Sequence, residues 1–346
     1  MALSYPEPRS LYPRPMLALL LSSLPVLLSP QEELQPVEIL DHDENVCAVA
    51  TDSKEKSLYT IDAKGVVRRW EMDGTGPLWE SAPHDMSDPR FGNAEYGLAI
   101  GEDVGARIGP GPVAEFQSVD LETGGITTGI ASLVGGKDLT QTYATKAVIV
   151  DPRDRWVWIG GQIGVARLMA KGTSGWSSRG MPNGGSLCFA LDPKANELAV
   201  GGEDGSIRFV GNKSANVEDK FFIEAHGKPV NALAWDPKGK LIASAADDSN
   251  VIVHKRRDGK VAHEFEPPFG DVAQLAFHPK GKWLAAGTER GRIALWDLKS
   301  GELLAEATLP EKRGGVHSLF VLDKGKTLVA AGSKCVVRID VESVGK

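Results

Sequence analysis

Cysteine is scarce in this chain, with three residues among 346. Cys47, Cys188 and Cys335 lie far apart, and no pair has the short spacing of a metal-binding or redox motif. This excludes a disulfide framework, and we expect no metal site. Basic residues are also too few for a nucleic-acid footprint, because 39 Lys and Arg stand against 46 Asp and Glu, a net charge of −7. We therefore expect no nucleic-acid partner.

Long hydrophobic runs are lacking as well. The apolar run at residues 16–28 spans about 13 residues, short of the ~20 that a membrane-spanning helix needs. It follows Arg9 and Arg14 and leads into a polar segment from Ser29, the order of regions in a secretory signal peptide. We predict a signal-peptide-like segment over residues 1–30, a secreted or periplasmic protein and no integral membrane span. Because Pro25 interrupts the run and no clear cleavage site follows, an uncleaved anchor or a simple N-terminal tail stays open.

Glycine is abundant, with 39 residues, and the chain contains an internal repeat. Four windows align without a gap at residues 146–169, 187–210, 231–254 and 273–296, and their starts lie 41, 44 and 42 residues apart. Residues 46–70 and 317–339 are two further copies. Residues 95–103 and 113–125 are remnants of a seventh, separated by a Gly-Pro-Gly-Pro loop at 109–112 that is either functional or a product of drift. A period near 42 residues is typical of propeller blades.

Each copy has the same internal order. An apolar strand leads to a polar turn such as Asp236-Pro237, in which proline presets the φ angle for a type I turn. A second strand rich in Ala and Gly follows, then a turn with glycine and a third strand. In one copy His278 replaces the aspartate of the first turn, and we expect it to be solvated. Short strands at this spacing predict antiparallel sheets in an all-β protein.

The pattern resembles the WD-repeat family from about residue 36 to residue 346. Trp296-Asp297 stands where that family carries its Trp-Asp pair, with Ser300-Gly301 following it. The resemblance implies a seven-bladed β-propeller of four-stranded antiparallel blades. The last copy lacks an outer strand, and residues 36–40 have no blade of their own. We predict that this N-terminal strand closes the ring by completing the last blade.

The family also carries a structural network of His, Ser or Thr, Asp and Trp. In one copy His254 stands at the Trp position, and in another Lys64 stands at the Asp position. The spacing from histidine to hydroxyl is 18 residues in both. The matching residues are His226, Ser244 and Asp248 in the first and His42, Thr60 and Trp70 in the second.

The resemblance further implies that residues just before the turn from the second to the third strand lie near the wider mouth of the ring. Residues entering the first strand lie beside them. Carboxylates gathered there would create a negative potential that favours a basic peptide, a protein patch or a cation. The predicted partner-binding residues are Asp62, Glu203, Asp247 and Glu289 of the first kind, and Asn231 and Asp271 of the second.

Catalytic signatures are missing from the sequence. It has no Gly-x-Ser-x-Gly elbow, and its glycine pairs do not lead into a helix that would bind phosphate. We therefore predict a non-enzymatic scaffold that binds a protein or peptide, without cofactor and as a monomer. The alternative is an extracytoplasmic propeller enzyme, metal-dependent and lactonase-like or quinone-dependent, with an axial site. The first strands carry mainly Ala, Leu, Val, Phe and Trp, which disfavours that alternative.

Overall fold

The computed structural model describes most of the chain from Glu32 onward. The described residues are 32–42, 44–52, 54–83, 97–108, 115–130, 145–161, 164–169, 176–179, 185–213, 219–267, 270–310 and 314–345. The predicted signal-peptide-like segment at residues 1–30 and the loop at 109–112 lie outside them. The compact unit begins at Glu32, slightly before the predicted start at residue 36.

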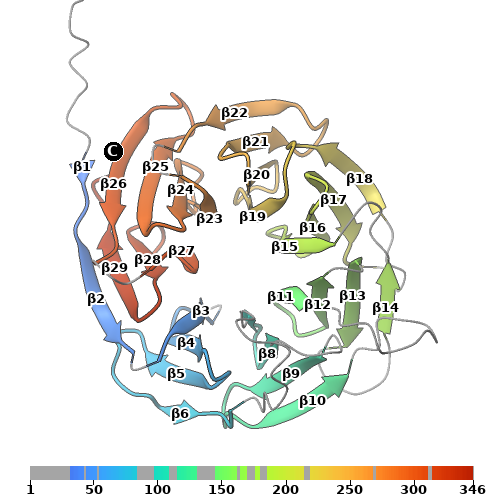
Figure 1. The fold of residues 1–346 in the computed structure, drawn as a ribbon, viewed down its shortest axis with the longest axis vertical. Helices are drawn as coiled ribbons and strands as arrows, with labels where there is room; N and C mark the ends of the chain where they lie inside the picture. Colours follow the sequence, from blue (N-terminus) through green and yellow to red (C-terminus); the bar gives the residue numbers. More distant parts are fainter. Residues whose placement is uncertain are drawn as a thin grey trace, which may run out of the picture. The chain divides into compact units, whose positions relative to one another are not determined.

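Seven sheets follow one another along the chain and form a ring of seven blades, as predicted (Figure 1). From the inner to the outer strand, blades 1 to 6 follow the chain order, whereas blade 7 takes its outer strand from the N-terminal part of the chain. Blade 1 is β3 (Val46–Thr51), β4 (Ser57–Asp62), β5 (Val67–Glu71) and β6 (Trp79–Glu80). Blade 2 is β7 (Gly97–Ile100), β8 (Val104–Ile108), β9 (Glu115–Asp120) and β10 (Ile126–Ile130). Blade 3 is β11 (Thr145–Val150), β12 (Trp156–Gly161), β13 (Gly164–Met169) and β14 (Trp176–Arg179).

The remaining four blades repeat this order. Blade 4 is β15 (Ser186–Leu191), β16 (Glu197–Gly202), β17 (Ser206–Gly211) and β18 (Asp219–Glu224). Blade 5 is β19 (Val230–Trp235), β20 (Leu241–Ala246), β21 (Val251–Lys255) and β22 (Val261–Phe265). Blade 6 is β23 (Val272–Phe277), β24 (Trp283–Thr288), β25 (Arg292–Asp297) and β26 (Leu303–Thr308). Blade 7 is β27 (Ser318–Leu322), β28 (Thr327–Ala331), β29 (Cys335–Asp340) and β2 (Pro36–Asp41).

The ring closes through the N-terminal strand, as predicted. β2 pairs antiparallel with β29, with Pro36 opposite Ile339 and Asp41 opposite Cys335. The inner strands of all neighbouring blades contact one another, including β27 of blade 7 and β3 of blade 1. The closing strand also brings Leu40 into a buried cluster with Trp70 of blade 1 and Val336 of blade 7. Both ends of the propeller therefore contribute to one hydrophobic core.

Two features of the blades differ from what the sequence suggested. Blade 2 is a complete antiparallel sheet of four strands and not a set of remnants. In addition, a short strand β1 (Glu32–Glu33) pairs parallel with β26 and gives blade 6 a fifth strand. Leu34 follows β1 and is buried against Ala305 and other core residues of blades 6 and 7.

The small residues of the second strands allow neighbouring blades to approach closely. Gly287 on β24 shows the reason, because a Cβ placed there would lie 2.5 Å from the Val316 Cγ1 atom of the next blade. Ala243, Ala245 and Ala285 are fully buried in the same second-strand region of blades 5 and 6. Within the described part of the chain, no helix is long and apolar enough to cross a membrane.

Candidate protein-binding face

Three acidic side chains occupy equivalent positions in successive blades. The backbone N–H of Glu203 bonds to the Gly185 carbonyl at 3.0 Å, that of Asp247 to the Pro229 carbonyl at 3.1 Å, and that of Glu289 to the Asp271 carbonyl at 3.0 Å. In each blade this bond joins the turn after the second strand to the entry of the first strand. Glu203, Asp247 and Glu289 are all exposed. The shared backbone geometry therefore presents one carboxylate per blade at the same end of blades 4, 5 and 6.

The two predicted residues that enter the first strands lie beside these carboxylates. Asn231 is the extra residue of a β-bulge between Val230 and Ala232, and bulges re-aim a side chain. Its side-chain amide donates a hydrogen bond to the Asp247 carboxylate. Asp271 is exposed and accepts a 2.9 Å hydrogen bond from the Ser249 hydroxyl of the preceding blade.

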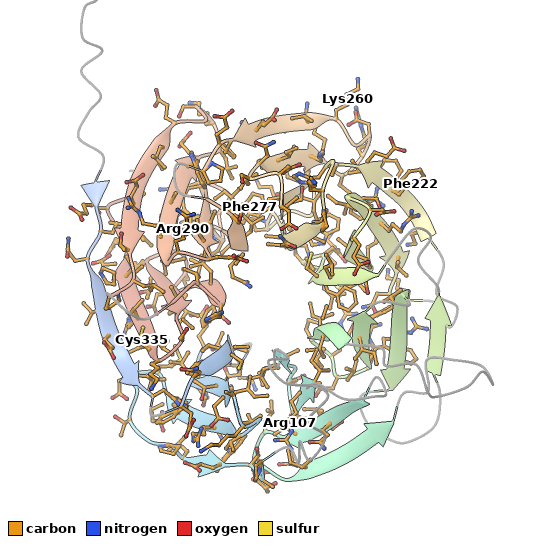
Figure 2. The ribbon with its side chains drawn as sticks, viewed as in Figure 1. Arg107, Phe222, Lys260, Phe277, Arg290 and Cys335 are labelled. Carbon is orange, nitrogen blue, oxygen red and sulfur yellow. The ribbon has the colours of Figure 1, made fainter. Side chains whose placement is uncertain are left out.

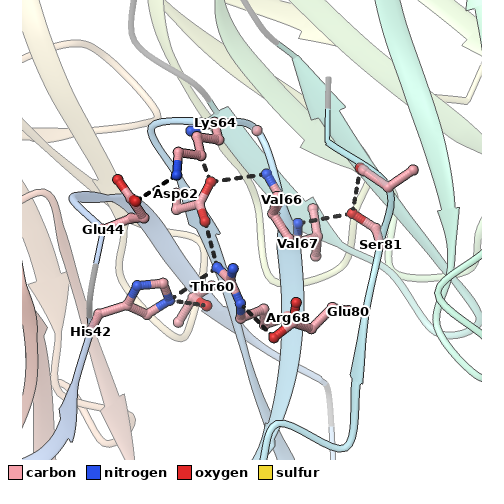
Figure 3. A network of polar contacts seen from close by, with 12 residues as sticks. His42, Glu44, Thr60, Asp62, Lys64, Val66, Val67, Arg68, Glu80 and Ser81 are labelled. Atoms are coloured by element: carbon pink, nitrogen blue, oxygen red, sulfur yellow. Dashed lines mark hydrogen bonds and ion pairs between the residues drawn. The ribbon is translucent and has the colours of Figure 1, made fainter. Parts of the chain in front are cut away.

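Asp62, in contrast, does not reach this surface, and its predicted placement there is wrong. Its side chain is fully buried, forms an ion pair with Arg68 at 2.5 Å and accepts the backbone N–H groups of Lys64 and Val66 (Figure 3). The residue of blade 1 that matches Glu203 is Ala63, whose N–H bonds to the Asn45 carbonyl at 2.8 Å. The alignment of the repeats placed blade 1 one residue out of register, because the turn of that blade differs in its sequence.

We call the exposed carboxylates of Glu203, Asp247, Asp271 and Glu289 the acidic turns. Glu203 also accepts the backbone N–H of Gly185 at 3.1 Å, so three of the four have a local hydrogen-bond donor. Within the described residues Glu289 has no ion-pair partner. Among the described residues, the exposed cations at the same end of the ring are Lys64, Lys228, Arg290 and Lys334. Only Lys228 and Arg290 belong to blades 4 to 6, so the four carboxylates of the acidic turns outnumber the cations there.

The structure brings the residues of both histidine networks together. In blade 5 the His226 Nδ1 atom lies 3.0 Å from Asp248, and its Nε2 atom lies 2.8 Å from the Ser244 hydroxyl. Asp248 follows Asp247 directly, so this buried network holds the backbone that carries an exposed carboxylate. The network is local in sequence, because the histidine precedes the first strand and its partners lie on and after the second.

Blade 1 contains a variant of the same network. The Trp70 indole N–H donates to the Thr60 hydroxyl at 3.0 Å. The His42 Nε2 atom lies 3.5 Å from the same hydroxyl (Figure 3). Lys64 turns outward to Glu44 at 2.6 Å, and the buried acid is Asp62, which neutralises Arg68. The network therefore keeps a carboxylate, supplied from two residues earlier than the sequence pattern indicated.

His254 takes the tryptophan position of blade 5 but not its hydrogen bond. Its side chain is buried, and among the described residues neither ring nitrogen has a hydrogen-bond partner. Burial lowers the pKa of His254, and the nearby His226 lowers it further. The imidazole is therefore neutral at pH 7.

The prediction that His278 is solvated is wrong. His278 is buried and not solvated, because its ring packs edge-on against Trp283 at 4.9 Å and its Nδ1 atom accepts the Lys280 N–H at 3.0 Å. Cys335, labelled in Figure 2, is the first residue of β29, and its side chain is buried.

The described residues offer little support for a nucleophilic cysteine or for a metal site. Burial raises the pKa of the Cys188 thiol to about 12, so the reactive thiolate does not form at neutral pH. Within the described ranges, no group of three or more His, Cys, Asp or Glu side chains could hold a metal ion.

Sequence reasoning missed buried and half-buried polar contacts between blades. The Asn212 side chain of blade 4 accepts the Trp158 indole N–H at 2.8 Å and donates to Asp151 at 2.7 Å, both in blade 3. The Arg256 guanidinium of blade 5 binds both carboxylate oxygens of Glu197 in blade 4, at 2.9 and 3.0 Å. Neither pair has a local sequence pattern, since the partners lie more than one repeat apart.

Comparison with known proteins agrees with this architecture. The family described as "WD domain, G-beta repeat" matches residues 218–255 and 259–297, which cover β18 of blade 4, the four strands of blade 5 and β23 to β25 of blade 6. A "66 kDa stress protein" of Physarum polycephalum is 21% identical over 304 residues, covering 86% of this chain and 46% of that protein.

Two further relatives have names that mention WD repeats or a complex. "WD repeat and FYVE domain-containing protein 1" of Mus musculus is 23% identical over 241 residues, covering 67% of this chain and 52% of that protein. "COMPASS component SWD3" of Saccharomyces cerevisiae is 26% identical over 148 residues, covering 43% of this chain and 45% of that protein. The chain spans about half the length of the curated relatives it matches.

Proposed function

We propose that this chain, which belongs to the WD-repeat β-propeller family, is a non-enzymatic scaffold whose acidic turns bind a basic peptide or a basic protein patch. Propellers of this family generally bind proteins. One of the relatives is named as a component of a complex, which is in keeping with a scaffold role. The function is an inference from the site, because the fold alone is shared by proteins of many activities.

The observation that carries the proposal is the equivalence of Glu203, Asp247 and Glu289. A rigid blade holds each carboxylate at the same turn position, and Asp271 adds a fourth between blades 5 and 6. Exposed carboxylates in a fixed array attract a cationic chain and increase its rate of association. Each exposed ion pair contributes only about 0.2–1 kcal/mol, so several must act together.

Charge reversal at two of these positions tests the proposal. Binding of a fluorescein-labelled Lys-rich peptide is measured by anisotropy for the double variant Asp247→Lys/Glu289→Lys. Replacing two attractive pairs by repulsive ones is expected to raise Kd about 5- to 30-fold. The matched control is Glu264→Lys/Glu302→Lys, which changes the net charge equally at exposed positions away from the acidic turns. Equal Kd values for the two double variants would refute the proposed site.

We also propose that the chain is exported. The support is the order of basic, apolar and polar regions over residues 1–30. N-terminal sequencing of the protein recovered from the extracytoplasmic fraction tests this. A mature protein that starts after the apolar run supports export with cleavage, and recovery only from the cytoplasm contradicts it.

A further inference from the structure

Three consecutive blades carry the same basic turn between their first and second strands. The turns are Lys238-Gly239-Lys240 in blade 5, Lys280-Gly281-Lys282 in blade 6 and Lys324-Gly325-Lys326 in blade 7. We call the six lysines the KGK track, and all six are exposed. Because the strands of a blade are antiparallel, these turns lie at the end of the ring opposite to the acidic turns.

The glycine of each turn makes the same backbone hydrogen bond. The glycine N–H bonds to the carbonyl three residues earlier at 2.9, 2.7 and 2.9 Å in blades 5, 6 and 7. The φ angles of Gly239, Gly281 and Gly325 are 65°, 66° and 99°, a region that favours glycine over every other residue. The lysines of blades 5 and 6 therefore take corresponding positions. The turn of blade 7 carries the same tripeptide on a different backbone, because Asp323 and Lys324 also have positive φ angles, 52° and 57°.

The turns pack against one another and form a continuous strip. A Cβ atom built on Gly281 would lie 3.8 Å from the Pro237 Cγ atom of blade 5. A Cβ atom built on Gly325 would collide with the His278 ring of blade 6. The lysines therefore come from one surface and not from three independent loops.

Blade 6 makes the centre of the strip strongly basic. Its turn carries His278 where the turn of blade 5 carries Asp236, so two lysines stand there without a carboxylate. Burial lowers the pKa of His278, and Lys282 and Lys280 lower it further, so the ring stays neutral and accepts the Lys280 N–H. The Asp236 carboxylate of blade 5 instead binds backbone N–H groups of its own turn, including that of Lys238 at 3.1 Å.

Most of these ammonium groups are available to a ligand. Lys326 forms an ion pair with Glu342 at 3.0 Å, and the Lys282 ammonium lies 3.4 Å from the Gly345 carbonyl. Within the described residues, Lys238, Lys240, Lys280 and Lys324 form no ion pair. Four exposed cations on a continuous strip thus lack a counter-charge in the part of the protein that the structure describes.

The surroundings of the strip indicate the shape of the ligand. At the same end and farther from the axis lie Asp297, at the end of β25 in blade 6, and Asp340 and Glu342, at and just after the end of β29 in blade 7. A flat anionic bilayer or a nucleic-acid duplex would cover these acids together with the lysines. The blade 7 turn also includes the exposed Asp323, which forms an ion pair with Arg338 at 3.3 Å and whose N–H bonds to Glu55 of blade 1 at 3.0 Å. A single extended chain can follow the inner strip and avoid the acids that lie farther from the axis.

The chemistry of the strip indicates its composition. Lysine ammonium groups are compact point charges without the planar fork by which arginine binds phosphate. The large hydrophobic residues exposed in the described chain are Val37, Leu78, Phe222 and Val261, none of them in these turns, so the strip offers no apolar anchor for lipid. We propose that the KGK track binds an extended polypeptide segment rich in Asp and Glu.

A pair of charge-matched variants tests the track. The probe is a fluorescein-labelled peptide of about twelve residues that alternate Glu and Gly, and binding is followed by anisotropy at low and at physiological salt. The track variant is Lys238→Gln/Lys280→Gln/Lys324→Gln. The control is Lys228→Gln/Arg290→Gln/Lys334→Gln, which removes the same charge from the opposite end of the ring. Thermal melts confirm that all proteins are folded.

The track variant is expected to bind the Glu peptide about tenfold more weakly than the wild type, and the control within about twofold of it. A single change, His278→Asp, puts into blade 6 the residue that the turn of blade 5 carries and should weaken binding about threefold. Equal weakening by the two triple variants, or none by the track variant, overturns the proposal. Tighter binding of phosphatidylserine vesicles or of a DNA duplex than of the peptide, lost in the same track variant, would also overturn it. Because the acidic turns are tested with a Lys-rich peptide, the two proposals can fail separately.

Discussion

The closing strand β2 offers a sharp test of how the ring is held together. Leu40 lies on this strand with 4% of its surface exposed, packed with Trp70, Val329 and Val336. Replacing it by alanine removes buried methyl groups and leaves a cavity, at a cost of about 2.7–5 kcal/mol in the free energy of unfolding. Val37 lies on the same strand but is 63% exposed, so Val37→Ala should change stability by no more than about 0.5 kcal/mol.

The expected change can be expressed as a melting temperature. At about 2.1 cal/mol/K per residue, a propeller of this size has an unfolding entropy of ~0.7 kcal/mol/K, so Leu40→Ala should lower Tm by about 4–8 °C. The shift from Val37→Ala should stay below about 1 °C on the same basis.

Circular dichroism melts and urea denaturation of the two variants measure the difference. Both substitutions keep the β2 backbone and its hydrogen bonds to β29, so the comparison isolates the buried contact that joins blades 1 and 7. Equal Tm values for Leu40→Ala and Val37→Ala would show that β2 does not contribute to the core. The reasoning about ring closure would then be refuted.

Two further predictions concern polar groups inside the propeller. Arg256→Lys keeps the charge but loses the forked contact with Glu197 and the stacking on Phe209 at 4.2 Å, so the free energy of unfolding measured with urea should fall by about 1–2 kcal/mol. The control Arg257→Lys, at a side chain 92% exposed, should lower it by less than about 0.5 kcal/mol. Equal losses of stability in the two variants would count against the forked contact. Because burial lowers the pKa of His254 below the ordinary 6.5, the unfolded chain binds a proton that the folded chain does not, and stability falls as the pH drops below about 6.5. His254→Gln should lose less stability than the wild type between pH 7.5 and 5, and an identical pH dependence of the urea midpoint would contradict this assignment.

Much of the fold could be predicted because a blade is encoded by local pattern. The alternation of strands and turns within 24 residues defined the sheets, and the unpaired segment at residues 36–40 indicated the closing strand. The spacing of His226 from Ser244 and Asp248 indicated their network, since all three lie within one repeat. The pairing of neighbouring strands through short turns leaves a pattern in the sequence. That pattern can be recognised without knowing how the blades pack against one another.

Which residue of a turn is exposed depends on the register between the turn and the strands, and the local sequence pattern does not specify that register. Asp62 and Ala63 differ by one position, yet one is buried against Arg68 and the other takes the place of Glu203 in its blade. Only the backbone hydrogen bonds to the preceding loop distinguish them, because a shift of one residue exchanges the buried and exposed sides of a strand end.

Contacts between blades were decided by tertiary structure alone. The sequence shows Lys-Gly-Lys in three repeats, but only the packing of Gly281 on Pro237 and of Gly325 on His278 joins the turns into one strip. The same holds for the bond between Asn212 and Trp158, whose positions are 54 residues apart. The rotation and spacing of one blade against the next follow from side-chain packing in the shared core, so residues a repeat or more apart meet only when the ring has formed.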